Sequence, residues 1–376
     1  MTSIYFPETY LDSRNYFHDQ LDRIKAGFPE AILQRHIISN DEDLSIDWID
    51  TDPERSKEKI LLISTGLHGV EGFVGAAMLD LFLKEYLPKI DPDNTGLILV
   101  HALNPWGMAN YRRYNRNNVD LNRNFMNESS DFDIVINPNY IKLDSVLNPK
   151  HPLKSIWRED LSFVKTVIIG LAQYGVRSFR EAVLLGQQSN PKGLYFSGRE
   201  YQAETLWVMD LVSDLLSHYK HVLHLDMHTG YGPSDQMCLV IAPSEPRDSV
   251  QLAEIYNLPL VNKADPEQFY KMQGDMVNWI YQYKEEHFPD TKFFSAACEF
   301  GTYGEGILRE TFSLRTIIYN NQADQQGTTS ESIRQQIHDK TVEMFFPRST
   351  SWREKAIADC RQAFSGVLSA EGFINI

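Results

Sequence analysis

The sequence predicts an α/β protein with a mostly parallel or mixed central sheet and helices on both faces. Continuous aliphatic runs, such as Ile60–Ile63 and Leu97–Val100, are typical of strands that are buried on both sides. Segments with helical spacing alternate with these runs, which is the pattern of parallel strands joined by crossover helices. Sheets of this class bind ligands beyond the carboxyl ends of their strands. Reactive side chains at those ends are therefore the first candidates for a functional site.

The individual elements follow from local patterns. An N-terminal helix is expected within residues 8–28, because Gly27 and Pro29 end its apolar periodicity. Strands are expected at residues 31–39, 44–49, 60–64, 97–103, 221–227, 237–242 and 293–300. Further helices are expected at residues 72–87, 201–218, 246–257 and 272–286.

No clear linker divides the 376 residues, so residues 1–376 are expected to form a single large domain. Residues 127–200 are rich in Asn-Pro and Lys-Pro turns, with a helical stretch near 155–173, and are expected to be an insertion that shapes a pocket. Residues 325–376 are expected to add polar, helical packing at the C-terminus.

Composition restricts the class of partner and the compartment. A net charge of −15 argues against a nucleic-acid partner, because it repels phosphates. Three widely spaced cysteines do not make a disulfide scaffold. The N-terminus lacks the pattern of a signal peptide, and the apolar runs are far shorter than the roughly 18 residues of a membrane helix. We therefore expect a cytoplasmic protein with no membrane partner, whose oligomeric state is open.

Two motifs at strand ends carry possible metal ligands. His68 and Glu71 are three residues apart after a buried strand, and zinc accepts both imidazole nitrogen and carboxylate oxygen. A simple helix-capping turn is the alternative interpretation. Alternation places His224, Asp226 and His228 on one face of another strand. His228 is then a candidate third ligand and Asp226 a candidate partner that orients its imidazole, although a hydrogen-bonded structural histidine is an equal alternative.

Two further features suggest substrate chemistry. Twelve residues contain Arg112, Arg113, Arg116 and Arg123, an unusual concentration in so acidic a chain. Arginine suits carboxylate recognition and the stabilisation of an oxyanion, whereas a solvated charged surface is the alternative. Glu299 ends a buried strand, where an acid is costly unless it is paired or serves as a base.

Taken together, these motifs make the sequence resemble the zinc carboxypeptidase superfamily, including its aspartoacylase and succinylglutamate-desuccinylase branch. The nearest likeness is to an uncharacterised bacterial group of carboxypeptidase-like proteins. The matching segments, in family order, are HGVE (68–71), NPWG (104–107), RYNRNNVDLNRNF (113–125), DMHTG (226–230) and CEFG (298–301). They span about 230 residues, and NPWG departs from the NPDG of the family.

The resemblance implies a zinc-dependent hydrolase, a metallopeptidase or deacylase, that cleaves an amide bond next to a carboxylate. It implies that His68, Glu71 and His228 bind one zinc ion and that Glu299 is the general base. In this interpretation zinc and Glu299 activate water, and zinc with an arginine stabilises the tetrahedral oxyanion.

The resemblance also implies how a small anionic peptide or N-acyl amino acid is held. Arg113 would polarise the scissile carbonyl, and Asn122 and Arg123 would bind the substrate carboxylate. Arg116 belongs to the same basic cluster and is a further candidate contact. Because 106 residues separate Asn122 from His228, about twice the gap expected, the insertion is expected to reshape the pocket.

Two alternatives remain at this stage. His224-Leu-Asp226, with Glu285-Glu286, imitates the ligands of a two-metal aminopeptidase, so one zinc ion is expected and two are possible. A carboxylate-binding module that has lost activity is the other alternative. The motifs do not separate a peptidase from a deacylase.

Overall fold

The computed structural model describes residues 3–39, 42–128, 131–132, 137–263 and 274–375. Within these ranges, one mixed eight-stranded sheet runs in the order β1-β2-β4-β3-β5-β8-β6-β7. Its strands are β1 (Ile32–Ser39), β2 (Leu44–Asp50), β3 (Lys59–Thr65), β4 (Thr95–His101), β5 (His221–Thr229), β6 (Met237–Ile241), β7 (Val261–Lys263) and β8 (Lys292–Phe300).

The centre of the sheet is parallel. β4, β3, β5 and β8 run in the same direction, and β4, β5 and most of β3 are buried along their length. The edges differ, because β1 pairs antiparallel with β2, β2 with β4, and β6 with β8. The predicted mixed α/β class is confirmed. The short strand β7 was not predicted, since its three residues are too few to show a pattern.

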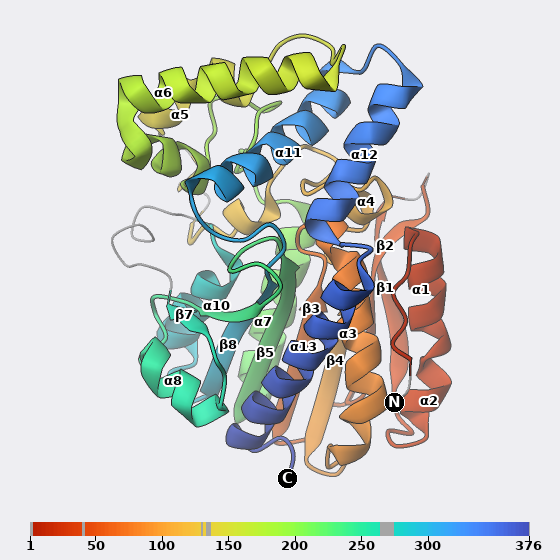
Figure 1. Cartoon of the computed structure of the whole chain (residues 1–376). Helices are drawn as coiled ribbons and strands as arrows, with labels where there is room; N and C mark the ends of the chain where they lie inside the picture. Colours follow the sequence, from red (N-terminus) through yellow and green to blue (C-terminus); the bar gives the residue numbers. More distant parts are fainter. Residues whose placement is uncertain (1–2, 40–41, 129–130, 133–136, 264–273, 376) are drawn as a thin grey trace.

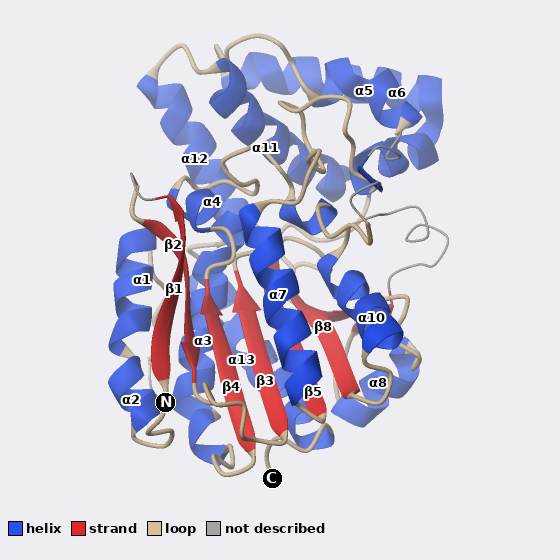
Figure 2. Cartoon of the chain, turned by 180° about the vertical axis from the view of Figure 1, so that it is seen from behind, coloured by secondary structure: helices blue, strands red, loops and turns tan. Residues whose placement is uncertain are grey.

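Helices cover both faces of the sheet (Figures 1 and 2). On the face seen in Figure 1 lie α1 (Tyr10–Asp19), α3 (Gly72–Glu85), α8 (Ser249–Tyr256) and α13 (Thr350–Ala370). The opposite face carries α7 (Ala203–His218) and α10 (Met276–His287), and the short α2 (Leu21–Lys25) follows α1. The large apolar core lies between β3, β5 and β8 and the helices α3 and α13.

A layer of helices lies beyond the carboxyl ends of the central strands, at the top of Figure 1. It contains α5 (Pro138–Leu147), α6 (Ile156–Leu184), α11 (Ile307–Gln326) and α12 (Glu331–Phe345). Below it are α4 (Pro105–Ala109) and the 3-10 turns η1 (Gly69–Glu71) and η3 (Leu121–Arg123), while η2 (Leu87–Lys89) follows α3. No helix in the described part of the chain is both long and apolar enough to cross a membrane.

Three helical expectations need correction. The helix expected near 155–173 continues to Leu184 after a break at Gly175, whose φ of 78° is outside the helical range. The helix α11 was not predicted at all. The C-terminal segment is helical as expected, but α13 also buries Trp352, Phe364 and Leu368 in the main core, so it is more than polar packing.

Candidate metal centre

The candidate ligands lie where β3 and β5 end. The chain leaves β3, passes His68 and enters η1, which contains Glu71 and leads directly into α3. Gly69 makes this turn possible, because a Cβ there would lie 2.2 Å from the backbone carbonyl carbon of Gly107 in α4. His228 comes from the last part of β5, which is hydrogen-bonded to β3 in parallel register. The sheet therefore brings the third ligand to the same place.

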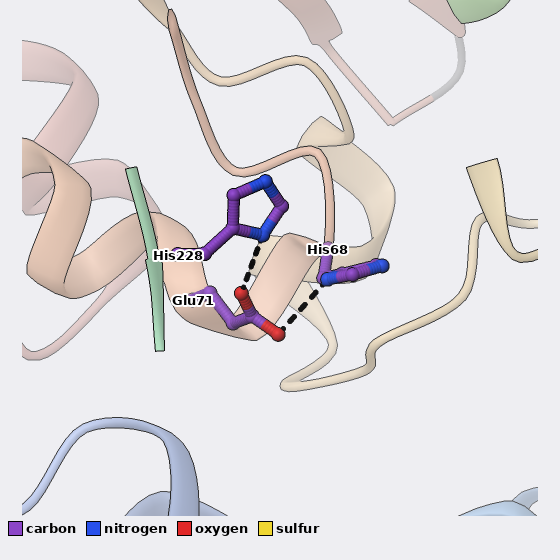
Figure 3. A group of neighbouring side chains, drawn as sticks. All are labelled: His68, Glu71 and His228. Atoms are coloured by element: carbon purple, nitrogen blue, oxygen red, sulfur yellow. Dashed lines mark hydrogen bonds and ion pairs between the residues drawn. The ribbon is translucent and has the colours of Figure 1, made fainter. Parts of the chain in front are cut away.

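Figure 3 shows both imidazole rings pointing at the carboxylate of Glu71. Nδ1 of His68 lies 3.0 Å from Oε1 of Glu71, and Nδ1 of His228 lies 3.0 Å from Oε2. One donor atom from each residue lies within 4.8 Å of the others, and in the described part of the chain these three residues form the one group of this kind. The structure thus brings together the three predicted ligands.

Each imidazole is held by a second carboxylate on its far side. Nε2 of His68 lies 3.2 Å from Oδ1 of Asp120, and Nε2 of His228 lies 2.5 Å from Oδ2 of Asp226. Asp226 also accepts a 2.6 Å hydrogen bond from Ser64 Oγ. A carboxylate only accepts hydrogen bonds, so it favours the tautomer with the proton on Nε2 and leaves Nδ1 free to coordinate a metal.

The donor set fits zinc. Two imidazole nitrogens and a carboxylate are the donors that zinc accepts in catalytic sites. Nδ1 of His68 is buried and makes no hydrogen bond to any described residue, although it faces a carboxylate oxygen. A cation between these donors gives that nitrogen a partner. Burial opposes the charge of Glu71, but His68 and His228 outweigh it and hold the pKa of its carboxyl well below the usual range.

Arg113 lies next to this cluster. Its Nε donates to Asp120 Oδ2 at 3.1 Å, and its NH1 lies 3.5 Å from Glu71 Oε1. The guanidinium carbon is also 5.9 Å from the ring centre of Tyr195. Although burial disfavours its charge, the neighbouring carboxylates raise the pKa of Arg113 above the usual value. The arginine is therefore a fixed cation beside the candidate ligands.

Glu299 is brought to the same edge by β8. It pairs with His228 across the parallel β5–β8 ladder, so the two side chains point to the same face of the sheet. Its Oε2 is buried and makes no hydrogen bond within the described residues. Burial raises the pKa of Glu299 to about 7, although His228 opposes the shift. A carboxyl with a pKa near neutrality is suited to accept and return a proton.

The residues predicted to contact substrate divide into two groups. Arg123 and Asn122 lie in η3, close to the cluster, where Asn122 donates to Asp275 Oδ2 at 3.1 Å and accepts from Met276 N at 2.9 Å. Arg116 lies outside the cluster. Its side chain is half exposed and pairs with Glu42 at 3.0 Å, so the structure does not bring it to the candidate site.

The residues of the two-metal interpretation are not gathered. His224 is held between Ser64 Oγ and Ser295 Oγ, each at 2.8 Å, inside the sheet. Asp226 is committed to Ser64 and His228. Glu285 is exposed on α10 and pairs with its neighbour Lys284 at 3.1 Å.

Two residues of the site were missed from the sequence. Asp120 contacts both His68 and Arg113, and the signal for it was its position as an acid inside the arginine cluster. Tyr195 lies over Arg113 and comes from the loop within residues 187–200. Nothing in its local sequence distinguishes Tyr195 from other loop tyrosines. Tyr195 lies close to Arg113 because of the path that the chain takes from the end of α6 back to the candidate site.

Fold and site together define an α/β protein with a His–Glu–His donor set at the carboxyl edge of its sheet. More particularly, the chain belongs to the family described as protein of unknown function, DUF2817, whose model matches residues 6–359. A comparison with curated proteins finds no match.

Several solved structures are similar to this chain at low identity. Carboxypeptidase A from Helicoverpa armigera is 15% identical, with 85% of this chain and 72% of that chain covered and a TM-score of 0.45. Bovine thrombin-activatable fibrinolysis inhibitor is 14% identical, with coverages of 84% and 96% and a TM-score of 0.45. A provisionally named metallopeptidase from Shewanella amazonensis is 14% identical, with coverages of 93% and 100% and a TM-score of 0.41.

Proposed function

We propose that the protein is a zinc-dependent hydrolase that cleaves an amide bond adjacent to a carboxylate. The observation that carries the proposal is the arrangement of His68, Glu71 and His228, with each imidazole oriented by its own carboxylate. Zinc bound by these residues supplies an electrophile that polarises a carbonyl and lowers the pKa of water. The surrounding residues transfer the proton and bind the charged groups of the substrate.

Glu299 is the proposed base. Its unpartnered Oε2 lies on the same face as His228 and accepts the proton of the attacking water. The same oxygen then returns the proton to the leaving nitrogen as the C–N bond breaks, so the products are a carboxylic acid and an amine, between which one proton then passes to give carboxylate and ammonium. The raised pKa of Glu299 supports this exchange, because both protonation states are accessible near neutral pH.

Arg113 is the proposed donor to the carbonyl oxygen. A guanidinium carries five N–H donors, and the contacts with Asp120 and Glu71 use two of them in the described part of the chain. Its position is fixed before substrate binds, which is the condition for stabilising charge that develops in the transition state.

The proposed substrate is a small anionic peptide or an N-acyl amino acid. The body of the protein is acidic, with a net charge of −15, and the partly buried Arg113 and the buried Arg123 are cations close to the cluster. Such an arrangement focuses an attractive potential on a small anion. Arg123 and Asn122 are the proposed contacts for its carboxylate.

Metal content and turnover test the proposal together. We expect protein purified without chelators to contain zinc, and His228→Ala to lose it, as measured by mass spectrometry. We expect the wild type to hydrolyse members of a panel of short peptides and N-acyl amino acids. Glu299→Gln keeps zinc and loses about 10²- to 10⁴-fold in kcat, the range for removal of a general base.

Glu285→Gln is the matched control, because this glutamate is exposed on α10. It keeps both zinc and activity if the proposal is right. Loss of one of two zinc ions in that variant instead supports the two-metal interpretation. A wild type that binds no zinc after addition of the metal overturns the proposed hydrolase.

A further inference from the structure

The helix α6 carries apolar side chains on two of its sides, and in the described part of the chain those on one side are largely exposed. Phe163 and Val167 are buried in the cluster that also contains residues of α5 and α11. On an adjacent side of the helix, the exposed fractions of four large side chains lie between 48% and 63%. These are Trp157, Leu161, Val164 and Ile168, which we call the α6 stripe. Their spacing of four, three and four residues places them in one row along the helix.

Basic residues outnumber acidic ones in α5, α6 and the loop between them. Residues 138–184 contain seven Lys and Arg residues and four acids, a net charge of +3 in a chain of −15. All seven cations are exposed, whereas none of the acids is. The cations are Lys142, Lys150, Lys154, Arg158, Lys165, Arg177 and Arg180.

The acids of this segment are partly buried and are engaged in ion pairs or hydrogen bonds. Asp160, for example, accepts from Tyr319 at 3.1 Å and pairs with Arg315 of α11 at 3.2 Å. Glu159 pairs with His151 at 3.2 Å, Glu181 with Arg177 at 3.1 Å and Asp144 with Lys150 at 3.6 Å. Arg180 pairs with Glu310 of α11 at 3.1 Å. The exposed surface of α5 and α6 is therefore both apolar and basic, although the protein as a whole is strongly acidic.

The position of α6 leaves this surface accessible. In Figures 1 and 2 the helix lies along the outer edge of the helical layer, at the opposite end of the molecule from both termini. A tryptophan begins the row, and its indole suits the boundary between water and hydrocarbon. The guanidinium of Arg158 lies 5.2 Å from the Trp157 ring, so a cation is at the same level.

We propose that α5 and α6 dock the protein onto an anionic phospholipid surface, with α6 lying flat in the headgroup region. An amphipathic helix with a basic polar side binds such surfaces by burying its apolar side and by attracting anionic lipids. Charge complementarity decides between the possible occupants. A second copy docked through the same face brings two net-positive segments together, and a nucleic acid offers nothing to the aliphatic side chains of the α6 stripe.

This surface was not expected from the sequence, which predicted no membrane partner because no segment spans a bilayer. The periodicity of α6 gives apolar residues on both sides of the helix, and only the packing against α11 tells which of them are covered. Peripheral docking needs no spanning segment.

Vesicle binding by the full-length protein tests the proposal. In co-sedimentation, we expect binding to phosphatidylcholine vesicles that contain phosphatidylglycerol, weak binding to phosphatidylcholine alone, and release by salt. Leu161→Glu with Ile168→Glu lowers the partition coefficient at least about tenfold. Arg158→Glu with Lys165→Glu lowers it about fivefold for each cation removed. The thermal midpoint stays unchanged in both variants, because all four side chains are exposed.

Val250→Glu is the matched control, since this apolar residue is equally exposed on α8. It binds vesicles as the wild type does if the α6 stripe is the docking surface. The proposal is overturned if the wild type ignores anionic vesicles, or if the Leu161→Glu and Ile168→Glu variant binds them normally. A dimer in vesicle-free solution that dissociates in that variant overturns it in favour of self-association.

Discussion

Replacement of Asp226 by Asn tests how the site keeps a histidine ready for metal. Oδ1 of Asp226 accepts from Ser64, and Oδ2 faces Nε2 of His228 at 2.5 Å. In Asp226→Asn the side-chain oxygen keeps the Ser64 bond, so the amide nitrogen faces Nε2. An amide donates a hydrogen bond there, which moves the imidazole proton to Nδ1. Nδ1 is the atom that faces Glu71, so the variant protonates the coordinating nitrogen.

The size of the effect follows from the contact that is lost. A hydrogen bond to a charged group contributes about 1.5–3 kcal/mol, or roughly 10- to 150-fold in an equilibrium constant. Loss of a carboxylate that orients a metal-bound histidine lowers metal affinity by about 10- to 100-fold. We therefore expect zinc affinity to fall about 10- to 100-fold in Asp226→Asn.

Competition with a fluorescent chelator at neutral pH measures this change. Asp339→Asn, an exposed carboxylate on α12, is the control and keeps the affinity of the wild type. Ser64→Ala gives a smaller loss in the same direction, because it frees Asp226 to rotate without removing its charge. An affinity within twofold of the wild type in a folded Asp226→Asn variant refutes the tautomer argument.

Three other predictions concern the site, its supporting turn and stability. Arg113→Ala lowers kcat/KM on the best substrate about 10²-fold or more. Arg116→Ala, which removes a surface ion pair, changes kcat/KM little. Equal losses in the two variants contradict the placement of the two arginines. Gly69→Ala lowers both thermal midpoint and zinc affinity because its Cβ meets backbone at 2.2 Å, whereas the nearest atom to a Cβ at Gly27 is 4.0 Å away and Gly27→Ala keeps both. Burial opposes the charge of Glu371, but the hydrogen bonds that its carboxylate accepts outweigh burial and lower its pKa in the folded protein. The ionised carboxylate therefore contributes to the free energy of unfolding above the unfolded pKa of about 4.3. This contribution is lost as the pH falls through the pKa of the folded protein. Urea unfolding from pH 7 downward then shows a shallower acid decline in Glu371→Gln, and equal slopes contradict it.

Most of the sheet could be predicted because its central strands carry an unambiguous signal. Runs such as Ile60–Ile63 and Leu97–Val100 are too short for buried helices and are bounded by polar turns, so their assignment as strands was correct. The helix α11 was missed because polar residues interrupt the apolar periodicity of its sequence. The break in α6 at Gly175 was also missed, because a glycine inside a helical pattern does not reveal its backbone angles.

The residues of the candidate site also divide into those that could be predicted from the sequence and those that could not. His68, Glu71 and His228 were found because they stand at strand ends, and strand ends of a parallel sheet converge. Arg116 was misplaced because the arginine cluster carries no indication of which side chains turn inward. Tyr195 could not be found, since its approach to Arg113 depends on the path of a loop more than 80 residues further along the chain.

The distance between His228 and Glu299 does not depend on the helices that surround the candidate site. The spacing of these two residues is set by the backbone hydrogen bonds between the adjacent parallel strands β5 and β8. A change in the register of these strands would break hydrogen bonds in the centre of the sheet. The helices above the strand ends contribute no backbone to that ladder. Substitutions and length changes in the helical layer can therefore alter the surroundings of the candidate site while leaving the spacing of the proposed ligand and the proposed base constant.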